Sequence, residues 1–294
     1  MSFIYGTAWK REDTAVFVSQ AIKHGFTSFD TAGQPKPYRE ELVGEAIRQA
    51  FATGQLHNRA DICIQTKFSR PEAQDPSNTA YPLDAPLEEQ VHLSIQNSLH
   101  NLRHEEAEDT SYLDALLLHS PYPDLQDTVQ AWRVFEQYVP SRIRALGICN
   151  VPFAKLKQLY EAVDVKPAVV QARFHKETAF EPEVRRFCAE KRIVFQAHKV
   201  LKGSNAALLE SELIGEAAAE LGVSRQAALY LCVLHLPGSV RIVNGTKSAA
   251  HMKEDLDAVE VLRGWGVGDA KEVLWRQYMG RFQTLIEEGS HVPS

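Results

Sequence analysis

The sequence predicts an α/β fold in which strand and helix units repeat around a parallel sheet. Short apolar runs alternate with longer amphipathic stretches from one end of the chain to the other, which is the pattern of consecutive βα units. Eight runs can be read as strands, the number that a (β/α)8 barrel uses, and a barrel of about this length forms one domain. We therefore expect a single-domain (β/α)8 barrel over residues 1–294.

The expected strands are apolar runs bounded by polar or turn residues. The first lies at Ile4, and the other seven are Thr27 to Asp30, Asp61 to Thr66, Tyr112 to His119, Ala145 to Cys149, Ala168 to Ala172, Ile193 to Ala197 and Arg241 to Val243. Helical periodicity predicts the segments between them, which are Thr14 to Lys23, Glu40 to Ala52, Leu87 to Asn101, Thr128 to Gln137, Phe153 to Tyr160, Glu181 to Glu190 and Ser211 to Leu221.

Several element boundaries carry residues with strong conformational preferences. Gly25 can end the first helix because glycine tolerates positive φ, and Ser224 can cap a helix from Gln226 to Leu234. Pro237 and Gly238 then end that helix before the last strand. The segment from Ser69 to Pro86 holds four prolines and is too long for a tight turn, which favours a loop that covers a substrate.

Composition excludes some classes of partner and location. A formal net charge of −6 and a pI near 6.0 argue against a general nucleic-acid binder, which needs a clustered basic face. The four cysteines lie far apart without a C-x-x-C pair, which indicates free thiols in a reducing compartment. No leader and no stretch of membrane-spanning length is evident. We expect a cytoplasmic protein, monomeric or weakly dimeric, without a membrane, nucleic-acid or metal partner.

Polar residues close several of the apolar runs. Asp30 and His119 each end a predicted strand, Lys67 directly follows another, and Tyr38 comes eight residues after Asp30. Because a parallel barrel gathers the carboxyl ends of its strands at one mouth, these side chains can converge on one substrate atom. Taken singly, Asp30 can be a cap, Lys67 a solvated strand end, Tyr38 a surface aromatic and His119 a structural histidine.

A series of motifs along the chain resembles the aldo-keto reductase family. Each motif alone is a weak signal, but together they follow the family's order over nearly the whole chain. They are G-T-A-W-K at 6–10, G-F-T-S-F-D-T-A at 25–32, Y-R-E-E-L-V-G-E-A-I at 38–47, T-K at 66–67, L-L-L-H-S-P at 116–121, G-I-C-N at 147–150, Gln171, G-T-K-S at 245–248 and K-E-D-L at 253–256.

The resemblance implies a (β/α)8 barrel that binds NADPH and reduces carbonyls by hydride transfer. A hydride that reaches a carbonyl carbon leaves negative charge on oxygen, which a positioned acid must neutralise. By resemblance Tyr38 is that acid, Lys67 supplies the positive charge that makes its proton easier to lose, and Asp30 holds Lys67 in place. His119 would bind the substrate oxygen and orient it.

The nicotinamide end of the cofactor has its own expected contacts. No G-x-G-x-x-G follows a strand, so a Rossmann turn is not indicated. By resemblance Asn150 and Gln171, with Cys149 where the family commonly has serine, would contact the nicotinamide carboxamide. Asn150 can equally be a helix cap and Gln171 a buried polar residue. Phe195 and His198 are both open as the stacking residue.

The stretch after the last strand is the expected phosphate site. Backbone amides at a helix start, a hydroxyl and cations suit a 2′-phosphate. We expect contacts from Gly245, Lys247, Ser248 and Lys253, with Glu254 and Asp255 nearer the adenine. Lys253 stands where the family often has arginine, so a point charge replaces a bidentate fork and the preference for NADP over NAD is weaker. The alternative is a solvated helix face of mixed charge.

One departure from the family concerns the proposed acid. Tyr38 follows Asp30 by eight residues rather than the family's usual five, and Gln34-Pro35-Lys36-Pro37 lies in between. The two prolines stiffen this loop and can fix where Tyr38 points.

Aromatic residues next to the motifs predict the substrate pocket. Trp9, Phe68 and Tyr122 are expected to line it, although each can be a core aromatic, and Trp265 and Trp275 are expected in helix packing. Cations on the predicted mouth loops suggest an acidic substrate, and they are Lys10, Lys36, Arg70 and Lys176. The function expected first is NADPH-dependent reduction of an aldehyde or ketone; the alternatives are a nicotinamide-binding regulatory protein and a non-redox acid-base enzyme.

Overall fold

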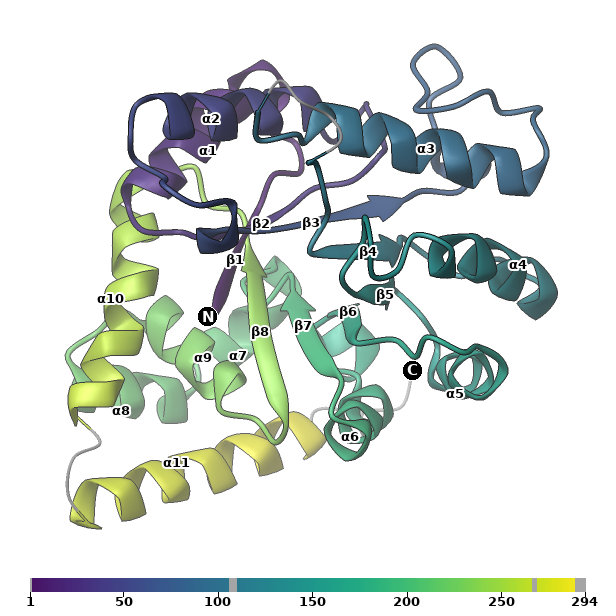
Figure 1. The fold of residues 1–294 in the computed structure, drawn as a ribbon. Helices are drawn as coiled ribbons and strands as arrows, with labels where there is room; N and C mark the ends of the chain where they lie inside the picture. The colour runs from purple at the N-terminus through teal and green to yellow at the C-terminus, as the bar shows by residue number, and fades with distance from the viewer. Residues whose placement is uncertain (1, 106–109, 266–268, 289–294) are drawn as a thin grey trace. The chain divides into compact units, whose positions relative to one another are not determined.

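The computed structural model describes residues 2–105, 110–265 and 269–288 (Figure 1). Its eight strands form a closed barrel in which each strand neighbours the next one along the chain. This confirms the predicted (β/α)8 fold. The strands are β1 Phe3–Gly6, β2 Ser28–Asp30, β3 Cys63–Phe68, β4 Ala115–Leu118, β5 Leu146–Cys149, β6 Val169–Arg173, β7 Val194–His198 and β8 Ser239–Asn244.

The helices agree closely with the sequence pattern in the first half of the chain, where α1 to α3 have the predicted bounds. The short α7 was not predicted, and for the long α11 helix packing was expected without bounds. The described helices are α1 Thr14–Lys23, α2 Glu40–Ala52, α3 Leu87–Asn101, α4 Leu125–Glu136, α5 Phe153–Ala162, α6 Pro182–Lys191, α7 Ala206–Leu209, α8 Glu212–Leu221, α9 Arg225–Leu234, α10 Ala249–Trp265 and α11 Asp269–Glu288.

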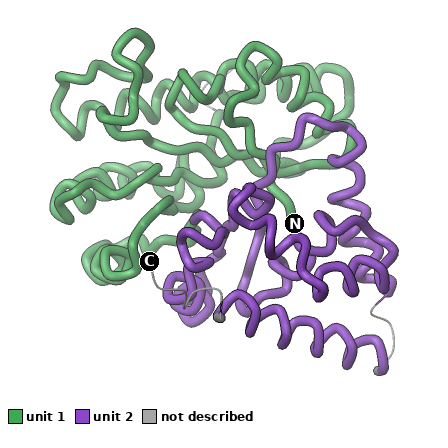
Figure 2. Tube along the Cα trace, turned by 180° about the vertical axis from the view of Figure 1, so that it is seen from behind, with its two compact units in different colours: residues 1, 3–171 green, residues 2, 172–294 purple. Residues whose placement is uncertain are grey.

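Two compact units divide the chain, one formed by residues 3–171 and the other by residues 172–294 together with Ser2 (Figure 2). The expected single domain stays a prediction.

In the first unit, strand register decides which polar residues become neighbours. Asp30 at the end of β2 pairs with Gln65 of β3, and Cys149 at the end of β5 pairs with Gln171 of β6. Successive side chains on a strand point to opposite faces, so Gln65 and Lys67 share one face of β3. Parallel pairing therefore brings Gln65 beside Asp30 although the two lie far apart in sequence.

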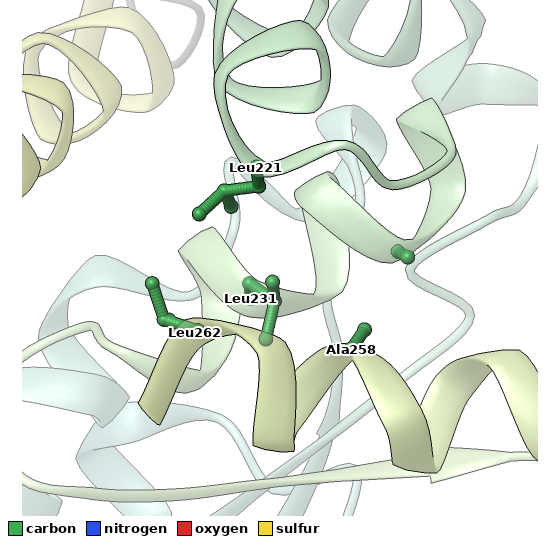
Figure 3. Packing of buried hydrophobic residues seen from close by; sticks show 5 residues of the cluster. Leu221, Leu231, Ala258 and Leu262 are labelled. Atoms are coloured by element: carbon green, nitrogen blue, oxygen red, sulfur yellow. The ribbon is translucent and has the colours of Figure 1, made fainter. Parts of the chain in front are cut away.

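In the second unit, helices α8, α9 and α10 pack around a small apolar cluster. Its buried residues are Leu221, Ala227, Leu231, Ala258 and Leu262, of which Figure 3 labels all but Ala227. Trp265 and Trp275 pack against this cluster with ring centroids 6.5 Å apart. The expected helix packing of these two tryptophans is confirmed.

The predicted boundary residues act as expected. Gly25 has φ +100°, a conformation that glycine adopts readily after a helix. Ser224 caps α9, because its hydroxyl oxygen accepts a hydrogen bond from the Ala227 amide at 3.2 Å.

Two further sequence expectations can be compared with the structure. All four cysteines are free thiols. Within the described ranges, none of the helices combines the length and the apolar character that a membrane crossing requires.

Candidate active site

A buried ion pair joins the ends of β2 and β3. The Lys67 ammonium lies 2.7 Å from Oδ1 and 2.6 Å from Oδ2 of Asp30, and it donates a third hydrogen bond, of 2.9 Å, to the carbonyl oxygen of Thr31. Burial is the largest single influence and lowers the pKa of Lys67, but Asp30, by its charge and its hydrogen bond, together with Tyr38 and Cys149 leaves the pKa above its ordinary value. Lys67 is therefore a fixed positive charge.

Two glutamines complete the surroundings of the Asp30 carboxylate. Oδ1 of Asp30 accepts a hydrogen bond of 2.6 Å from Gln65 Nε2 and one of 3.0 Å from Gln171 Nε2. The Cys149 thiol lies 3.7 Å from the Gln171 side-chain oxygen. The Gln171 amide thus holds Asp30, and the predicted contact of Gln171 with the nicotinamide carboxamide stays a prediction.

The Tyr38 ring lies near both Lys67 and His119. The Lys67 ammonium is 5.3 Å from the centroid of this ring, and the Tyr38 and His119 rings are 5.9 Å apart in an edge-to-face arrangement. Burial raises the pKa of the Tyr38 phenol above its ordinary value, although the Lys67 charge acts in the opposite direction. Tyr38 is therefore protonated at neutral pH and next to a cation that can stabilise its phenolate.

His119 follows β4 directly and is held by its neighbours. A hydrogen bond of 2.6 Å joins its Nδ1 to the hydroxyl of Ser69, and its backbone amide donates to the carbonyl oxygen of Phe68. The Asn150 side-chain amide donates to the His119 carbonyl oxygen at 3.0 Å. These contacts fix both the backbone and the ring orientation of His119.

Asn150 has the features of a ligand-contacting residue. Its backbone is left-handed, with φ +52°, a conformation that asparagine tolerates better than most residues. Its Oδ1 atom is buried without a hydrogen-bond partner among the described residues. A buried unpaired acceptor is costly unless a ligand satisfies it, and the NH2 of a carboxamide is a suitable donor.

In the second unit, α10 starts within the predicted phosphate motif. The Ser248 hydroxyl accepts from the His251 amide at 3.4 Å, and the Thr246 hydroxyl accepts from the Ser248 amide at 3.1 Å. Lys247 is exposed directly before the helix. A cation and a hydroxyl at the start of a long helix match the chemistry of a phosphate site.

The other residues of the phosphate motif have different surroundings. Asp255 is buried and accepts a 2.6 Å hydrogen bond from the Asn244 side chain, and burial raises its pKa to about 7. Lys253 is exposed and pairs with Asp257 one turn further along α10, while Glu254 is half-buried and Gly245 is exposed. The expected contacts of these residues with a cofactor stay predictions.

The three predicted pocket aromatics occupy different environments. Trp9 is 56% exposed, whereas Phe68 is 0% exposed and stacks on Tyr81 at 5.4 Å between ring centroids. Tyr122 is buried, and its hydroxyl has no partner among the described residues. Phe68 therefore has the surroundings of a core aromatic, and Trp9 is the one of the three that a substrate could reach directly.

The cations predicted for an acidic substrate are largely engaged within the protein. Lys10 is buried 5.4 Å from the centroid of the Tyr5 ring, and Lys36 pairs with Asp75 at 3.2 Å. Arg70 lies over the Tyr122 ring, within 4.0 Å of Glu72. Lys176, in the second unit, is exposed. These contacts weaken the expectation of an acidic substrate.

Comparison with protein families matches residues 2–263 to the Aldo/keto reductase family. The chain belongs to this family. Family membership makes it an oxidoreductase of carbonyl compounds and supports a nicotinamide cofactor and small-molecule carbonyl substrates. The resemblance inferred from the sequence is thereby confirmed.

Relatives with named activities cover much of this aldo/keto reductase. NADPH-dependent codeinone reductase 1-3 of Papaver somniferum is 28% identical over 81% of this chain and 73% of its own. Morphine 6-dehydrogenase of Pseudomonas putida is 32% identical over 58% of this chain and 49% of its own. An aldo/keto reductase of Brucella melitensis superposes with a TM-score of 0.68 at 25% identity, covering 87% of this chain and 88% of its own.

One polar group of this aldo/keto reductase was missed by the sequence analysis. Glu40, two residues after Tyr38, is only 4% exposed; it accepts a hydrogen bond from the Thr66 hydroxyl and bonds of 3.0 Å from the Ser98 hydroxyl to both carboxylate oxygens. Burial raises the pKa of Glu40 to about 7, although these hydroxyl groups lower it. Its position within a helical motif gave no sign that it would be buried.

The sequence analysis also did not predict that several cations of the second unit would lie close together. Arg173 and Lys199 lie at the ends of β6 and β7, and Lys202 pairs with Glu177 close by. Burial lowers the pKa of Lys199, and the charges of Arg173 and Lys202 lower it further. Basic residues just after two neighbouring strands were the signal that could have found this group.

The described part of the chain holds no cluster of histidine, cysteine and acidic side chains that could bind a metal ion.

Proposed function

We propose that this aldo/keto reductase reduces an aldehyde or ketone to an alcohol with NADPH, and that Tyr38 is the general acid. The observation that carries the proposal is the position of the Tyr38 ring, with the buried Lys67 ammonium 5.3 Å from its centroid and the His119 ring 5.9 Å away. An acid, a fixed cation and an imidazole grouped in this way suit a carbonyl oxygen that gains negative charge.

Tyr38 delivers the proton. Its raised pKa keeps the phenol protonated before the reaction, so that a proton is present when charge develops on the substrate oxygen. The proton moves from the hydroxyl of Tyr38 to that oxygen and leaves a phenolate. The Lys67 charge stabilises the phenolate, and Asp30 keeps Lys67 in position.

His119 and Asn150 orient the reactants. With Nδ1 bound to Ser69, the imidazole of His119 is held in one orientation and can direct the substrate oxygen toward Tyr38. The buried Oδ1 of Asn150 can accept a hydrogen bond from the nicotinamide carboxamide. When bound, the reduced nicotinamide supplies the hydride to the carbonyl carbon.

The proposed choice of NADPH over NADH rests on the start of α10 and on the named relative. Lys247 and Ser248 offer a cation and a hydroxyl to the 2′-phosphate, and codeinone reductase is NADPH-dependent by name. Lys253 lies inside α10 and pairs with Asp257, whereas Lys247 precedes the helix start, so we expect Lys253 to add less than Lys247. Replacing Lys247 by alanine should narrow the difference in Kd between NADPH and NADH, and Lys253→Ala should narrow it less.

The decisive variant is Tyr38→Phe. It removes only the phenolic hydroxyl, so NADPH oxidation with a panel of aldehydes and ketones should fall by about 100-fold or more, because general acid catalysis contributes roughly that factor. Affinity for NADPH, measured by fluorescence titration, should stay within about twofold. Full activity of Tyr38→Phe would show that another group donates the proton.

Two other outcomes would favour the alternative functions. Tight NADPH binding by the unaltered protein without carbonyl reduction would indicate a nicotinamide-binding regulatory protein. Conversion of substrate without any change in the oxidation state of the cofactor would indicate acid-base chemistry without redox.

A further inference from the structure

Residues 33–37 and 69–86 belong to two loops that are tied together next to the proposed active site. The first loop carries Tyr38 and includes the insertion found in the sequence. The second begins at Ser69, whose hydroxyl binds His119. Whatever joins these loops therefore acts on the proposed acid and on the proposed orienting histidine at the same time.

One side chain, Gln74, bonds to both loops. Its Nε2 donates a 2.9 Å hydrogen bond to the carbonyl oxygen of Gly33 and a 3.1 Å hydrogen bond to the carbonyl oxygen of Ser69. Gln74 is only 7% exposed, and Ser69 is fully buried. A buried amide that serves two backbone carbonyls is expensive to lose, because the Gly33 carbonyl oxygen would lose this donor and the Ser69 carbonyl oxygen would keep only the Tyr81 hydroxyl.

The two residues that Gln74 joins, Gly33 and Ser69, lie in backbone segments with hydrogen bonds of their own near the proposed active-site residues. The Gly33 amide donates to the Lys67 carbonyl oxygen at 2.9 Å, and the Tyr38 amide donates to the Gln34 carbonyl oxygen at 3.1 Å. On the other side, Tyr81 donates from its hydroxyl to the Ser69 carbonyl oxygen. The backbone on each side of Gln74 is thus fixed by contacts of its own.

The insertion itself supplies two more ties. The Gln34 side chain donates to the Ala73 carbonyl oxygen, and Lys36 pairs with Asp75 at 3.2 Å. These partners flank Gln74 in sequence, so the segment 73–75 contacts the Tyr38 loop at three successive residues. The longer spacing between Asp30 and Tyr38 is accommodated by docking the added residues on the second loop.

We propose that Gln74 is a positioning residue that sets the Tyr38 loop and the Ser69–His119 contact in one arrangement, so that acid and histidine meet the same substrate oxygen. The proposal rests on the roles proposed above for Tyr38 and His119. A shift of about 1 Å in a reacting group can reduce a rate by about 100-fold, so loss of the bridge acts on turnover.

The chain offers a matched control. Gln90 at the start of α3 is 5% exposed, and its Nε2 also donates to two backbone carbonyls of the 69–86 loop, those of Leu83 and Ala85, at 2.9 and 2.8 Å. Gln74→Met and Gln90→Met therefore remove equivalent hydrogen bonds from the two ends of one loop. Similar losses of melting temperature are expected from both.

Of the two methionine variants, only Gln74→Met should slow catalysis. We expect its kcat to fall by about 10- to 100-fold with NADPH affinity unchanged within about threefold, while Gln90→Met keeps kcat within about threefold. Ser69→Ala, which removes the hydroxyl that holds His119, should reproduce much of the loss, and the double variant should lose less than the product of the two. Equal kcat values for Gln74→Met and Gln90→Met overturn the proposal.

A spectroscopic readout separates this proposal from the proposed function. The NMR signals of the His119 ring should shift in Gln74→Met and in Ser69→Ala but not in Gln90→Met, whether or not a substrate is turned over. Unchanged His119 signals in Gln74→Met refute the positioning role even if Tyr38→Phe is inactive. If the unaltered protein reduces no carbonyl, the proposed function fails. The His119 signals then decide by themselves whether Gln74 has the positioning role.

Discussion

Lys67 and Asp30 form a buried ion pair in which one ammonium contacts both carboxylate oxygens, at 2.7 and 2.6 Å. Gln65 and Gln171 add two neutral donors to the same carboxylate. Burying a charge pair stabilises a protein only when the remaining donors and acceptors of the two groups are satisfied. Here Gln65 and Gln171 donate to the carboxylate, and the Thr31 carbonyl oxygen accepts from the ammonium. The pair therefore has consequences for folding as well as for catalysis.

Removal of Lys67 alone should destabilise the protein strongly. Lys67→Met leaves the Asp30 carboxylate buried without its cation, which should lower the free energy of unfolding by about 3–5 kcal/mol. The double variant Asp30→Asn, Lys67→Met buries no unpaired charge and should recover part of this loss. Urea unfolding of the two variants tests the expectation, and a double variant less stable than Lys67→Met would contradict it.

Glu40 should make stability depend on pH. Its pKa in the folded protein, about 7, lies above the ordinary 4.5, so the folded state holds the proton more tightly than the unfolded state. The contribution of Glu40 is complete below about pH 4.5 and is lost as pH rises through 7, which amounts to about 3 kcal/mol. Asp255, with its pKa raised to about 7, adds a loss in the same direction.

Glu40→Gln should remove most of the contribution that Glu40 makes to the pH dependence of stability. Melting temperatures between pH 5 and pH 8 should fall less in this variant than in the unaltered protein, since no carboxylate has to ionise in the interior. Glu45→Gln, at an exposed position of the same helix, is the control and should leave the slope unchanged. An identical slope in Glu40→Gln would show that Glu40 does not titrate in this range.

Alanine variants of Trp9 and Phe68 should have different effects, Phe68→Ala on stability and Trp9→Ala on substrate binding. Phe68→Ala empties a fully buried position and should lower the free energy of unfolding by about 3–5 kcal/mol. Trp9→Ala changes a side chain that is 56% exposed and should alter stability by less than about 0.5 kcal/mol. If Trp9 contacts substrate, its removal raises KM, and steady-state kinetics with unchanged KM would exclude that contact.

Asn150→Ala should weaken cofactor binding. The variant removes the buried Oδ1 acceptor offered to the carboxamide, and one lost hydrogen bond corresponds to about a 10-fold rise in Kd for NADPH. It also removes the hydrogen bond to the His119 carbonyl oxygen, so a melting curve must accompany the fluorescence titration. An unchanged Kd with an unchanged melting temperature would assign Asn150 to backbone support alone.

Local sequence patterns predicted much of the framework. Alternating runs located the eight strands, and α1, α2 and α3 have the predicted bounds because their ends carry turn residues and their faces show helical spacing. Asp30 and Lys67 were predicted to converge because both close strands of one parallel barrel, and their ion pair bears this out. For α11 the aromatic residues indicated helix packing, but no helix bounds were predicted.

The sequence by itself located the eight strands to within a few residues and placed Asp30, Lys67 and His119 at or near their ends, because strand and helix periods are local properties of the chain. The order of its motifs resembled a family whose chemistry suits a carbonyl. Only the tertiary structure decided that Gln65 and Gln171 hold Asp30, that Phe68 lies in the core and that Gln74 joins two loops. Those outcomes depend on strand register and on loop docking between residues distant in sequence. A glutamine in a loop carries no local sign of the two carbonyl oxygens that it will meet.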